Sequence, residues 1–239
     1  MKRLLLISNS TLYGSGYLDH AQSEIQDFLG KSARMAFVPF AMHDWSGYAT
    51  QARERFQAMG YELVSLHEGS NPQRTLAESD GIFVGGGNTF RLLKGLYDFD
   101  LLRAICQCVE RGLPYVGSSA GSNVACPTLK TTKDMPIVQP PSFEALGLVR
   151  FQISPHYLDP DLASTHMGET QEERILQFLE ENETPVLGLR EGAMVRIEGE
   201  KMTLKGSAKA RLFRRGATPV EATPGADLGV LLHPPEEQA

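Results

Sequence analysis

The chain has 239 residues, 41% of them hydrophobic, and a formal net charge of −6 at pH 7. This size fits one large globular domain that buries its core without disulfides or metals. The acidic balance, without any Lys/Arg block, argues against nucleic-acid binding, and no apolar run approaches the ~20 residues of a membrane span. Three cysteines provide no disulfide framework, and no His or Cys cluster suggests a zinc site. We therefore expect a soluble, cytoplasmic protein with no nucleic-acid, membrane or metal partner.

The first half of the chain alternates apolar runs with segments of helical periodicity. The apolar runs predict strands at 2–8, 34–40, 61–66, 81–84 and 113–117. The periodic segments predict helices at 17–29, 45–59, 72–79, 88–97 and 100–111. A repeat of this kind forms a mostly parallel sheet with helices on both of its faces.

The pattern changes after residue 125. Residues 127–147 hold four prolines and little periodicity. Strands are predicted at 148–154 and 185–189, with a helix at 170–181 between them, and short strands alternate with glycine turns from 193 to 222. We expect a single α/β domain over 1–222 and a frayed tail over 223–239, because the last residues are rich in Pro, Glu and Gln.

A serine-containing turn follows the fifth predicted strand, in the stretch 114-PYVGSSAGSNVACP-127. Residues 117–121 match G-x-S-x-G with Ser119 at the centre. In this context the glycines allow a sharp strand-to-helix turn that exposes the serine, and the next backbone N–H can face a developing oxyanion. Ser118 and Ser122 lie off the centre of the motif and are interpreted as turn or capping residues. Ser119 is the candidate nucleophile, with Ala120 as an oxyanion donor.

A serine nucleophile needs a base, and the base needs an orienting acid. His156 ends the strand predicted at 148–154, so it also lies at a strand's carboxyl end; His166, in a polar loop, is the second candidate. Asp134 and Glu191 both lie in loops and both fit the role of the acid. The residues alone leave that choice open.

A second glycine-rich turn, Gly85 to Thr89, follows the fourth predicted strand. A dinucleotide fingerprint would need glycine where Phe90 stands, so that template fails. The turn either supplies further oxyanion donors through Gly86 or Gly87, or allows close packing of helix on strand.

Several long stretches resemble the peptidase E family of α-aspartyl dipeptidases. They are LLLISNSTL, VGGGNTFRLLK, YVGSSAGSNVACPT, TTKDMPIV, QISPHY, HMGETQEERI and LREG. The resemblance covers nearly the whole chain. It implies a fold like that of class I glutamine amidotransferases, a flavodoxin-like three-layer α/β/α sandwich with a mostly parallel central sheet, followed here by a short-stranded C-terminal part.

The resemblance also implies a serine peptidase that removes N-terminal aspartate from Asp-X dipeptides without a cofactor. Carried over by motif, Ser119 is the nucleophile, His156 the base and Asp134 the preferred acid, with Glu191 as the alternative. The GGGN turn would contribute part of the oxyanion hole. Asn88 would belong to the substrate site beside it.

Recognition of aspartate requires a cation close to the substrate's side-chain carboxylate. The family typically has an arginine directly after GET, where this chain has Gln171. Arg174 could substitute for that arginine, and the helix N-terminus at Thr170 also attracts anions. Three further cations are candidates: Lys130, Lys133 and Arg190.

Three alternative functions remain at this stage. A cyanophycinase-like enzyme would cut β-aspartyl–arginine bonds with a similar serine turn. A class I amidotransferase would need a cysteine nucleophile, and Cys126 lies seven residues beyond Ser119 and outside the turn. A non-enzymatic module could hold a small anion at the two glycine turns.

The short late strands could also pair two copies of the chain, so we consider a homodimer.

Overall fold

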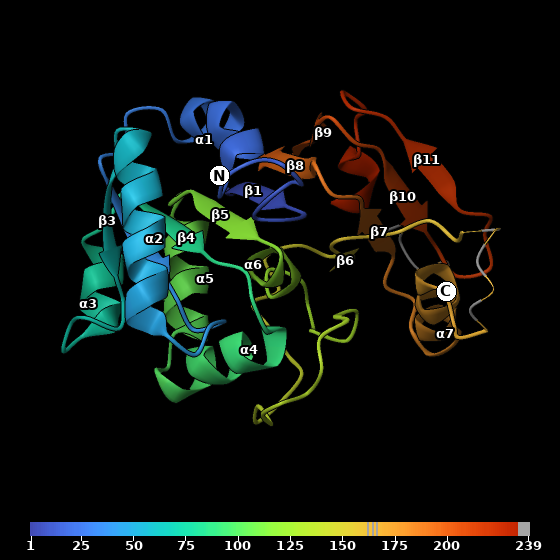
Figure 1. Cartoon of the computed structure of the whole chain (residues 1–239), viewed down its shortest axis with the longest axis horizontal. Helices are drawn as coiled ribbons and strands as arrows, with labels where there is room; N and C mark the ends of the chain where they lie inside the picture. The colour runs from blue at the N-terminus through green and yellow to red at the C-terminus, as the bar shows by residue number, and fades with distance from the viewer. Residues whose placement is uncertain (162, 164, 166, 234–239) are drawn as a thin grey trace.

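The computed structural model describes the whole chain except residues 162, 164, 166 and 234–239 (Figure 1). A seven-stranded sheet runs through its larger part. In spatial order its strands are β3 (Glu62–Ser65), β2 (Arg34–Val38), β4 (Gly81–Val84), β5 (Tyr115–Ser118), β1 (Arg3–Ile7), β8 (Ala193–Glu198) and β9 (Lys201–Gly206). The first five of these are parallel, and the β8–β9 hairpin joins β1 antiparallel.

Helices cover both faces of this sheet, as the sequence predicts. Along β1, Leu5 and Ile7 point into the apolar cluster that includes residues of α1 (Gln22–Leu29) and α2 (Trp45–Ala58). Leu4 and Leu6 point to the opposite face, into the cluster that includes residues of α3 (Pro72–Ala77), α4 (Thr89–Asp98) and α5 (Leu102–Glu110). Side chains alternate along a strand, so a continuous apolar run is what a strand buried on both faces requires.

A second, four-stranded sheet lies beside the first (Figure 1). It comprises β11 (Val220–Ala222), β10 (Ala210–Phe213), β7 (Val186–Leu189) and β6 (Gln152–Ser154), in that spatial order. Helix α7 (Gln171–Glu181) buries Ile175 and Leu179 with Tyr157, Val186 and Phe213. The sequence predicts these late strands but not that they divide between two sheets.

The sequence predicts a frayed tail over residues 223–239, but residues 223–233 are packed against the rest of the protein. Leu228 and Leu231 are buried, and a short 3-10 helix spans Gly229–Leu231. The amide of Leu228 donates to Met202 in β9, so this segment packs against the central sheet. Burial of the two leucines outweighs the polar composition that suggested fraying. Residues 234–239 lie outside the described part of the chain.

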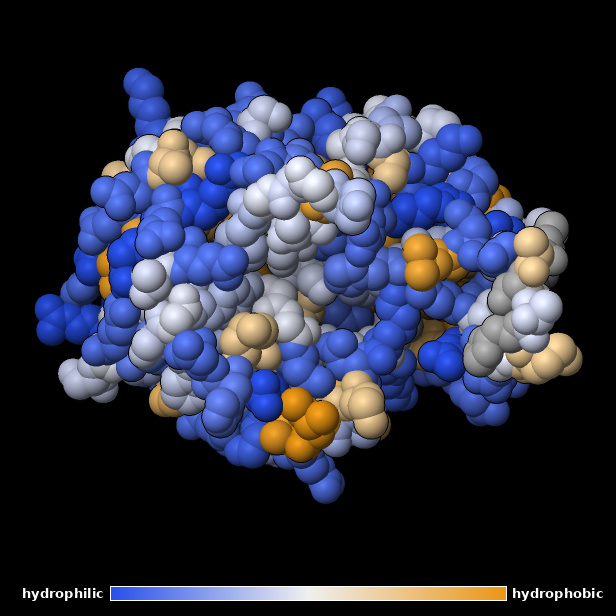
Figure 2. Space-filling view, viewed as in Figure 1, coloured by the Kyte–Doolittle hydropathy of each residue, from blue (hydrophilic) through white to orange (hydrophobic). Residues whose placement is uncertain are grey.

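The carboxyl ends of β4 and β5 lie side by side, because Val84 pairs with Gly117 in parallel register. The GGGNT and GSSAG turns therefore leave the central sheet as neighbours. In the second sheet β6 and β7 are also parallel, so the residues that follow them share an edge. Figure 2 shows this face of the molecule hollowed between the part built on the central sheet and the part built on the second sheet. None of the described helices is both long and apolar enough to cross a membrane.

Candidate active site

Ser119 occupies the turn between β5 and the short helix α6 (Ala120–Asn123). Its backbone has φ 52° and ψ −109°, a conformation that non-glycine residues rarely adopt and that the surroundings must stabilise. The amide of Ser119 donates to the carbonyl of Ile7 at 2.9 Å, which ties the turn to β1. A side chain at Gly121 would overlap the carbonyl oxygen of Val84. The turn therefore requires glycine there, as the G-x-S-x-G pattern predicts.

His156 comes from the second sheet and reaches across to this serine. It follows β6 with φ 53°, and its amide donates to Ser8 Oγ at 2.9 Å. Its Nε2 lies 2.8 Å from Ser119 Oγ. The contact between the candidate nucleophile and base thus bridges the two sheets.

The two candidate acids lie in different environments. Oε1 of Glu191, which follows β7, lies 2.7 Å from His156 Nδ1. Asp134 forms no hydrogen bond with His156 in the described part of the chain. Its Oδ2 accepts from the amide and the hydroxyl of Thr89, at 2.6 and 2.7 Å. The preference for Asp134 is therefore not supported by the geometry, because its carboxylate is engaged at the start of α4.

Arg190 supports this arrangement from the second sheet. Its guanidinium donates to both carboxylate oxygens of Asp159 and of Glu221, and these two anions raise the pKa of Arg190. The same group lies 5.4 Å from the ring centroid of Tyr157. Because Arg190 and Tyr157 adjoin Glu191 and His156 in the chain, this cluster fixes the two segments that carry the acid and the base.

The GGGN turn lies directly against the serine. A Cβ atom built on Gly86 would lie 3.1 Å from Ser119 Cβ, so glycine allows the two turns to approach. Among the described residues, the amides of Gly87 and Ala120 donate to no other protein group. An oxyanion hole requires unpaired amides near the nucleophile, and Ala120 directly follows Ser119 while Gly87 belongs to the turn that contacts it.

The cationic side chain of Lys133 contacts the backbone of His156. Lys133 Nζ donates to the carbonyl of His156 at 2.7 Å and to Gln171 Oε1 at 3.1 Å. The side chain is exposed overall, yet the protein atoms around its ammonium partly desolvate it and lower the pKa of Lys133 to about 8. Gln171 also accepts from the amide of Leu158 at 2.9 Å. Gln171 is thus a link between Lys133 and the segment after His156.

The other residues expected to bind substrate have structural partners. Thr170 and Glu173 form a capping box, so the helix's own carboxylate already occupies the α7 N-terminus. Arg174 is exposed and pairs with Glu169 at 3.6 Å. Asn88 caps α4 by accepting from Arg91 and donates to the carbonyl of Met135 at 2.9 Å.

Of two further candidates from the sequence, the structure places Cys126 alone. Burial raises the pKa of the Cys126 thiol to about 12, and Cys126 Sγ accepts from the amide of Ile153. A thiol in that state is a poor nucleophile because the thiolate is scarce at neutral pH. His166, the second candidate base, lies outside the described residues.

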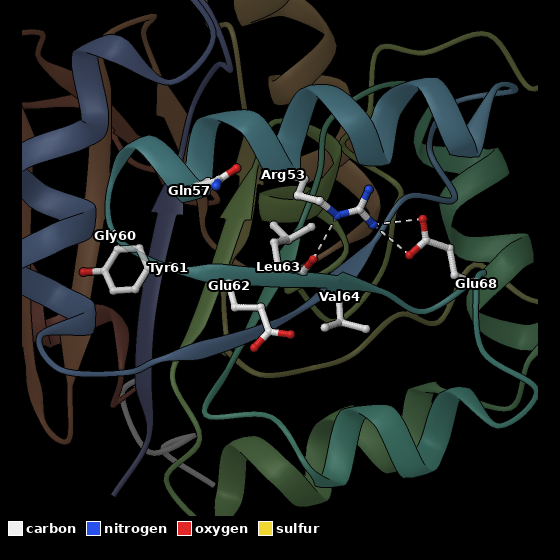
Figure 3. Close-up of a pocket in the computed structure, with 8 residues that line it drawn as sticks. All are labelled: Arg53, Gln57, Gly60, Tyr61, Glu62, Leu63, Val64 and Glu68. Carbon is white, nitrogen blue, oxygen red and sulfur yellow. Dashed lines mark hydrogen bonds and ion pairs between the residues drawn. The ribbon is translucent and has the colours of Figure 1, made fainter.

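A hollow of about 650 Å³ lies elsewhere, over the edge strand β3 and helix α2 (Figure 3). In it Arg53 donates to both carboxylate oxygens of Glu68, at 2.9 and 2.7 Å, and to the carbonyl of Leu63. Strands β2 and β4 separate this edge from β5. The hollow holds a satisfied ion pair and shares no residue with the serine site.

Residues 4–205 match peptidase family S51. The chain belongs to this family. It is 56% identical to peptidase E of Streptomyces coelicolor over 96% of this chain and 94% of that protein. It is 49% identical to the probable alpha-aspartyl dipeptidase of Drosophila melanogaster over 97% of this chain and 98% of that protein.

A solved structure of a peptidase from an acI-B1 actinobacterium has the same fold as this S51 peptidase. The two superpose with a TM-score of 0.71 at 16% identity, over 95% of this chain and 96% of the other. The expected α/β fold is confirmed, as is the resemblance to the peptidase E family.

Sequence reasoning missed two residues that organise the site of this S51 peptidase. Ser8 is buried at the end of β1, where it donates to the carbonyl of Leu189 and accepts from the amide of His156. A polar residue directly after a buried apolar strand was the available signal. Asp159 forms an ion pair with Arg190 at 2.6 Å, and no pattern in the sequence distinguishes it from an ordinary loop carboxylate.

Proposed function

We propose that this S51 peptidase is a serine dipeptidase that hydrolyses Asp-X dipeptides at the bond after the N-terminal aspartate. The observation that carries the proposal is the pair of hydrogen bonds that joins Ser119 to His156 and His156 to Glu191. The names of the relatives, peptidase E and alpha-aspartyl dipeptidase, support the substrate class. No metal or organic cofactor is required by this chemistry.

The geometry suits acyl transfer through a covalent intermediate. With its Nδ1–H donated to the Glu191 carboxylate, His156 presents an unprotonated Nε2 to Ser119 and can accept the hydroxyl proton. Ser119 Oγ then attacks the carbonyl carbon of the aspartyl residue. His156 returns the proton to the leaving amine, and water repeats the sequence to release aspartate.

In this scheme the negative charge of the tetrahedral intermediate forms beside the two glycine turns. The amides of Gly87 and Ala120 are the proposed donors, and the N-terminus of α6 adds partial positive charge at the same place. Gly86 contributes by its lack of a side chain, which lets the GGGN turn lie against Ser119. Asp134 is assigned a supporting role, because it holds Thr89 at the start of α4.

Rates on three substrates test the proposal. The purified enzyme should hydrolyse Asp-Leu, release little from β-Asp-Arg, and produce no ammonia from glutamine. Cleavage of β-Asp-Arg alone would favour a cyanophycinase-like activity. Glutamine hydrolysis that is lost in Cys126→Ala would favour an amidotransferase, an outcome that the burial of Cys126 argues against. Absence of turnover on all three would favour an anion-binding module.

We also propose a cytoplasmic location. Cys106, Cys108 and Cys126 are free thiols, which suits a reducing compartment. The expected homodimer stays a prediction, which the molar mass from light scattering would test.

A further inference from the structure

We infer that Lys133 is the cation that binds the side-chain carboxylate of the substrate's aspartate. The inference rests on the proposed function, since it assigns the residue that makes an Asp-X peptidase selective for aspartate. Four observations support it: the position of the ammonium, its lack of an ion pair with a carboxylate among the described residues, the carboxylate partners of two competing arginines, and a small cavity beside it.

The ammonium of Lys133 lies next to the residue that would activate the nucleophile. Its Nζ is 2.7 Å from the carbonyl oxygen of His156, whose ring contacts Ser119. A substrate whose scissile carbonyl meets Ser119 would carry its aspartate side chain two bonds away from that carbonyl. A cation fixed to the backbone of His156 is therefore within reach of a short acidic side chain.

In the part of the chain that the structure describes, Lys133 forms no ion pair with a carboxylate, although the charges of Asp134 and Glu191 act on its pKa. Among the described residues, the lysines that form ion pairs with carboxylates are Lys94 and Lys205. Lys133 instead donates two of its three N–H bonds to neutral oxygens, those of His156 and Gln171. These acceptors orient the ammonium without neutralising it, and one N–H remains for an anion. Desolvation lowers the pKa of Lys133 to about 8, although the charges of Asp134 and Glu191 act to raise it, so these carboxylates do not fully offset the desolvation.

Two of the competing cations, Arg190 and Arg174, have carboxylate partners. Arg190 donates to the carboxylates of both Asp159 and Glu221, so two anions already offset its charge. Arg174 is exposed and pairs with Glu169 at 3.6 Å, although it also lines the cavity beside Lys133. Neither forms a hydrogen bond with His156 in the described part of the chain, whereas Lys133 does.

A small cavity adjoins the ammonium. It has a volume of about 160 Å³, and its charged lining residues are Lys130, Lys133, Asp134 and Arg174, beside residues that include Thr132, Ser154, Gln171 and Ile175. Its hydroxyl and amide groups can accept or donate further hydrogen bonds to a carboxylate. A cavity of this size suits one short side chain and excludes a folded polypeptide, which agrees with a dipeptide substrate.

The test compares Asp-Leu with Asn-Leu, which differs only in the charge of the side chain. In Lys133→Met the ratio of the two kcat/KM values should fall by about 10- to 100-fold, because one hydrogen bond to a charged group is lost. The loss should appear mainly in KM for Asp-Leu and should be much larger than any change in kcat/KM for Asn-Leu. Equal losses on both substrates, or an unchanged ratio, would overturn the inference. Should Lys133→Met fail to fold, Lys133→Gln measures the same ratio.

Three further variants sharpen the comparison. Lys94→Met removes a lysine from the outer surface of α4 and should leave the ratio unchanged. Gln171→Arg in the Lys133→Met background should restore much of the preference, because the Gln171 side chain reaches within 3.1 Å of the lost ammonium. A collapse of the ratio in Arg174→Met, with Lys133→Met unaffected, would assign the role to Arg174 instead.

Binding of free aspartate, measured by calorimetry on Ser119→Ala, separates this inference from the proposed function. Suppose that the wild type hydrolyses Asp-Leu and that Ser119→Ala/Lys133→Met binds aspartate as tightly as Ser119→Ala does. The inference about Lys133 would then be wrong, and the proposed function would stand. If instead the wild type hydrolyses no Asp-Leu but aspartate binding depends on Lys133, the proposed peptidase reaction would be wrong. The assignment of Lys133 as the cation that binds aspartate would remain.

Discussion

Nε2 of His156 lies 2.8 Å from Oγ of Ser119, although the two residues are 37 positions apart and follow strands of different sheets. Ser119 has φ 52° and His156 has φ 53°, so both partners adopt a left-handed backbone. Such conformations cost about 1–3 kcal/mol each and persist only where the surroundings impose them. Here the carbonyl of Ile7 holds one residue and the hydroxyl of Ser8 the other, so consecutive residues at the end of β1 and just beyond it set the distance.

Replacement of the nucleophile is the first prediction. Ser119→Ala should lower kcat on Asp-Leu by about 10⁴- to 10⁶-fold, as removal of a triad serine does elsewhere. Circular dichroism should show a retained fold, because the side chain is only half-buried. Ser118→Ala provides the matched control, since Ser118 Oγ contacts Ser10 Oγ rather than a histidine. Wild-type turnover in Ser119→Ala would remove the nucleophile assignment.

The two acids should respond differently to loss of charge. Glu191→Gln should lower kcat by about 10²- to 10⁴-fold with little change in stability, because an amide orients and stabilises the histidine poorly. Asp134→Asn should instead lower the free energy of unfolding by about 1.5–3 kcal/mol, because it weakens two charge-assisted bonds to Thr89. Rates and urea unfolding curves measure the two effects. An unchanged kcat in Glu191→Gln would return Asp134 to consideration.

The pH profile should report the charge of Lys133. Lysine is cationic below its pKa, and that pKa is lowered to about 8, so aspartate binding should weaken as the pH rises through 8. KM for Asp-Leu should therefore rise above pH 8. The α-amine of the dipeptide titrates near the same pH. Asn-Leu carries the same amine and therefore serves as the control. The effect of Lys133 is measured by the ratio of KM for Asp-Leu to KM for Asn-Leu at each pH. A pH-independent ratio would contradict the prediction.

The backbone of the serine turn should be intolerant of a side chain at Gly121. Gly121→Ala places a Cβ atom onto the carbonyl oxygen of Val84. We expect a loss of about 1–3 kcal/mol or more in the free energy of unfolding, together with reduced activity. Gly14→Ala is the control, because Gly14 has φ +76° but no atom within 4 Å of a Cβ. It should cost only the strain of a left-handed residue, about 1–2 kcal/mol. Urea unfolding distinguishes the two variants.

The sequence by itself determined the parallel core and indicated most members of the candidate site. Continuous apolar runs such as that of β1 predict strands buried on both faces, and parallel strands place the GGGNT and GSSAG turns at one edge. Ser119 and His156 followed from their positions at strand ends, and the motifs indicated the family. Apolar runs, glycine turns and motifs are local properties of the chain, so they can be recognised in a single sequence.

The tertiary structure decided which polar groups meet. Asp134 and Glu191 both lie in loops, and the sequence does not say which loop faces His156; the second sheet brings Glu191 there and leaves Asp134 with Thr89. The same applies to Lys133, which reads as a surface charge until its ammonium is found on the carbonyl of His156. Contacts between residues distant in the chain depend on the packing of the two sheets, and no local pattern encodes them.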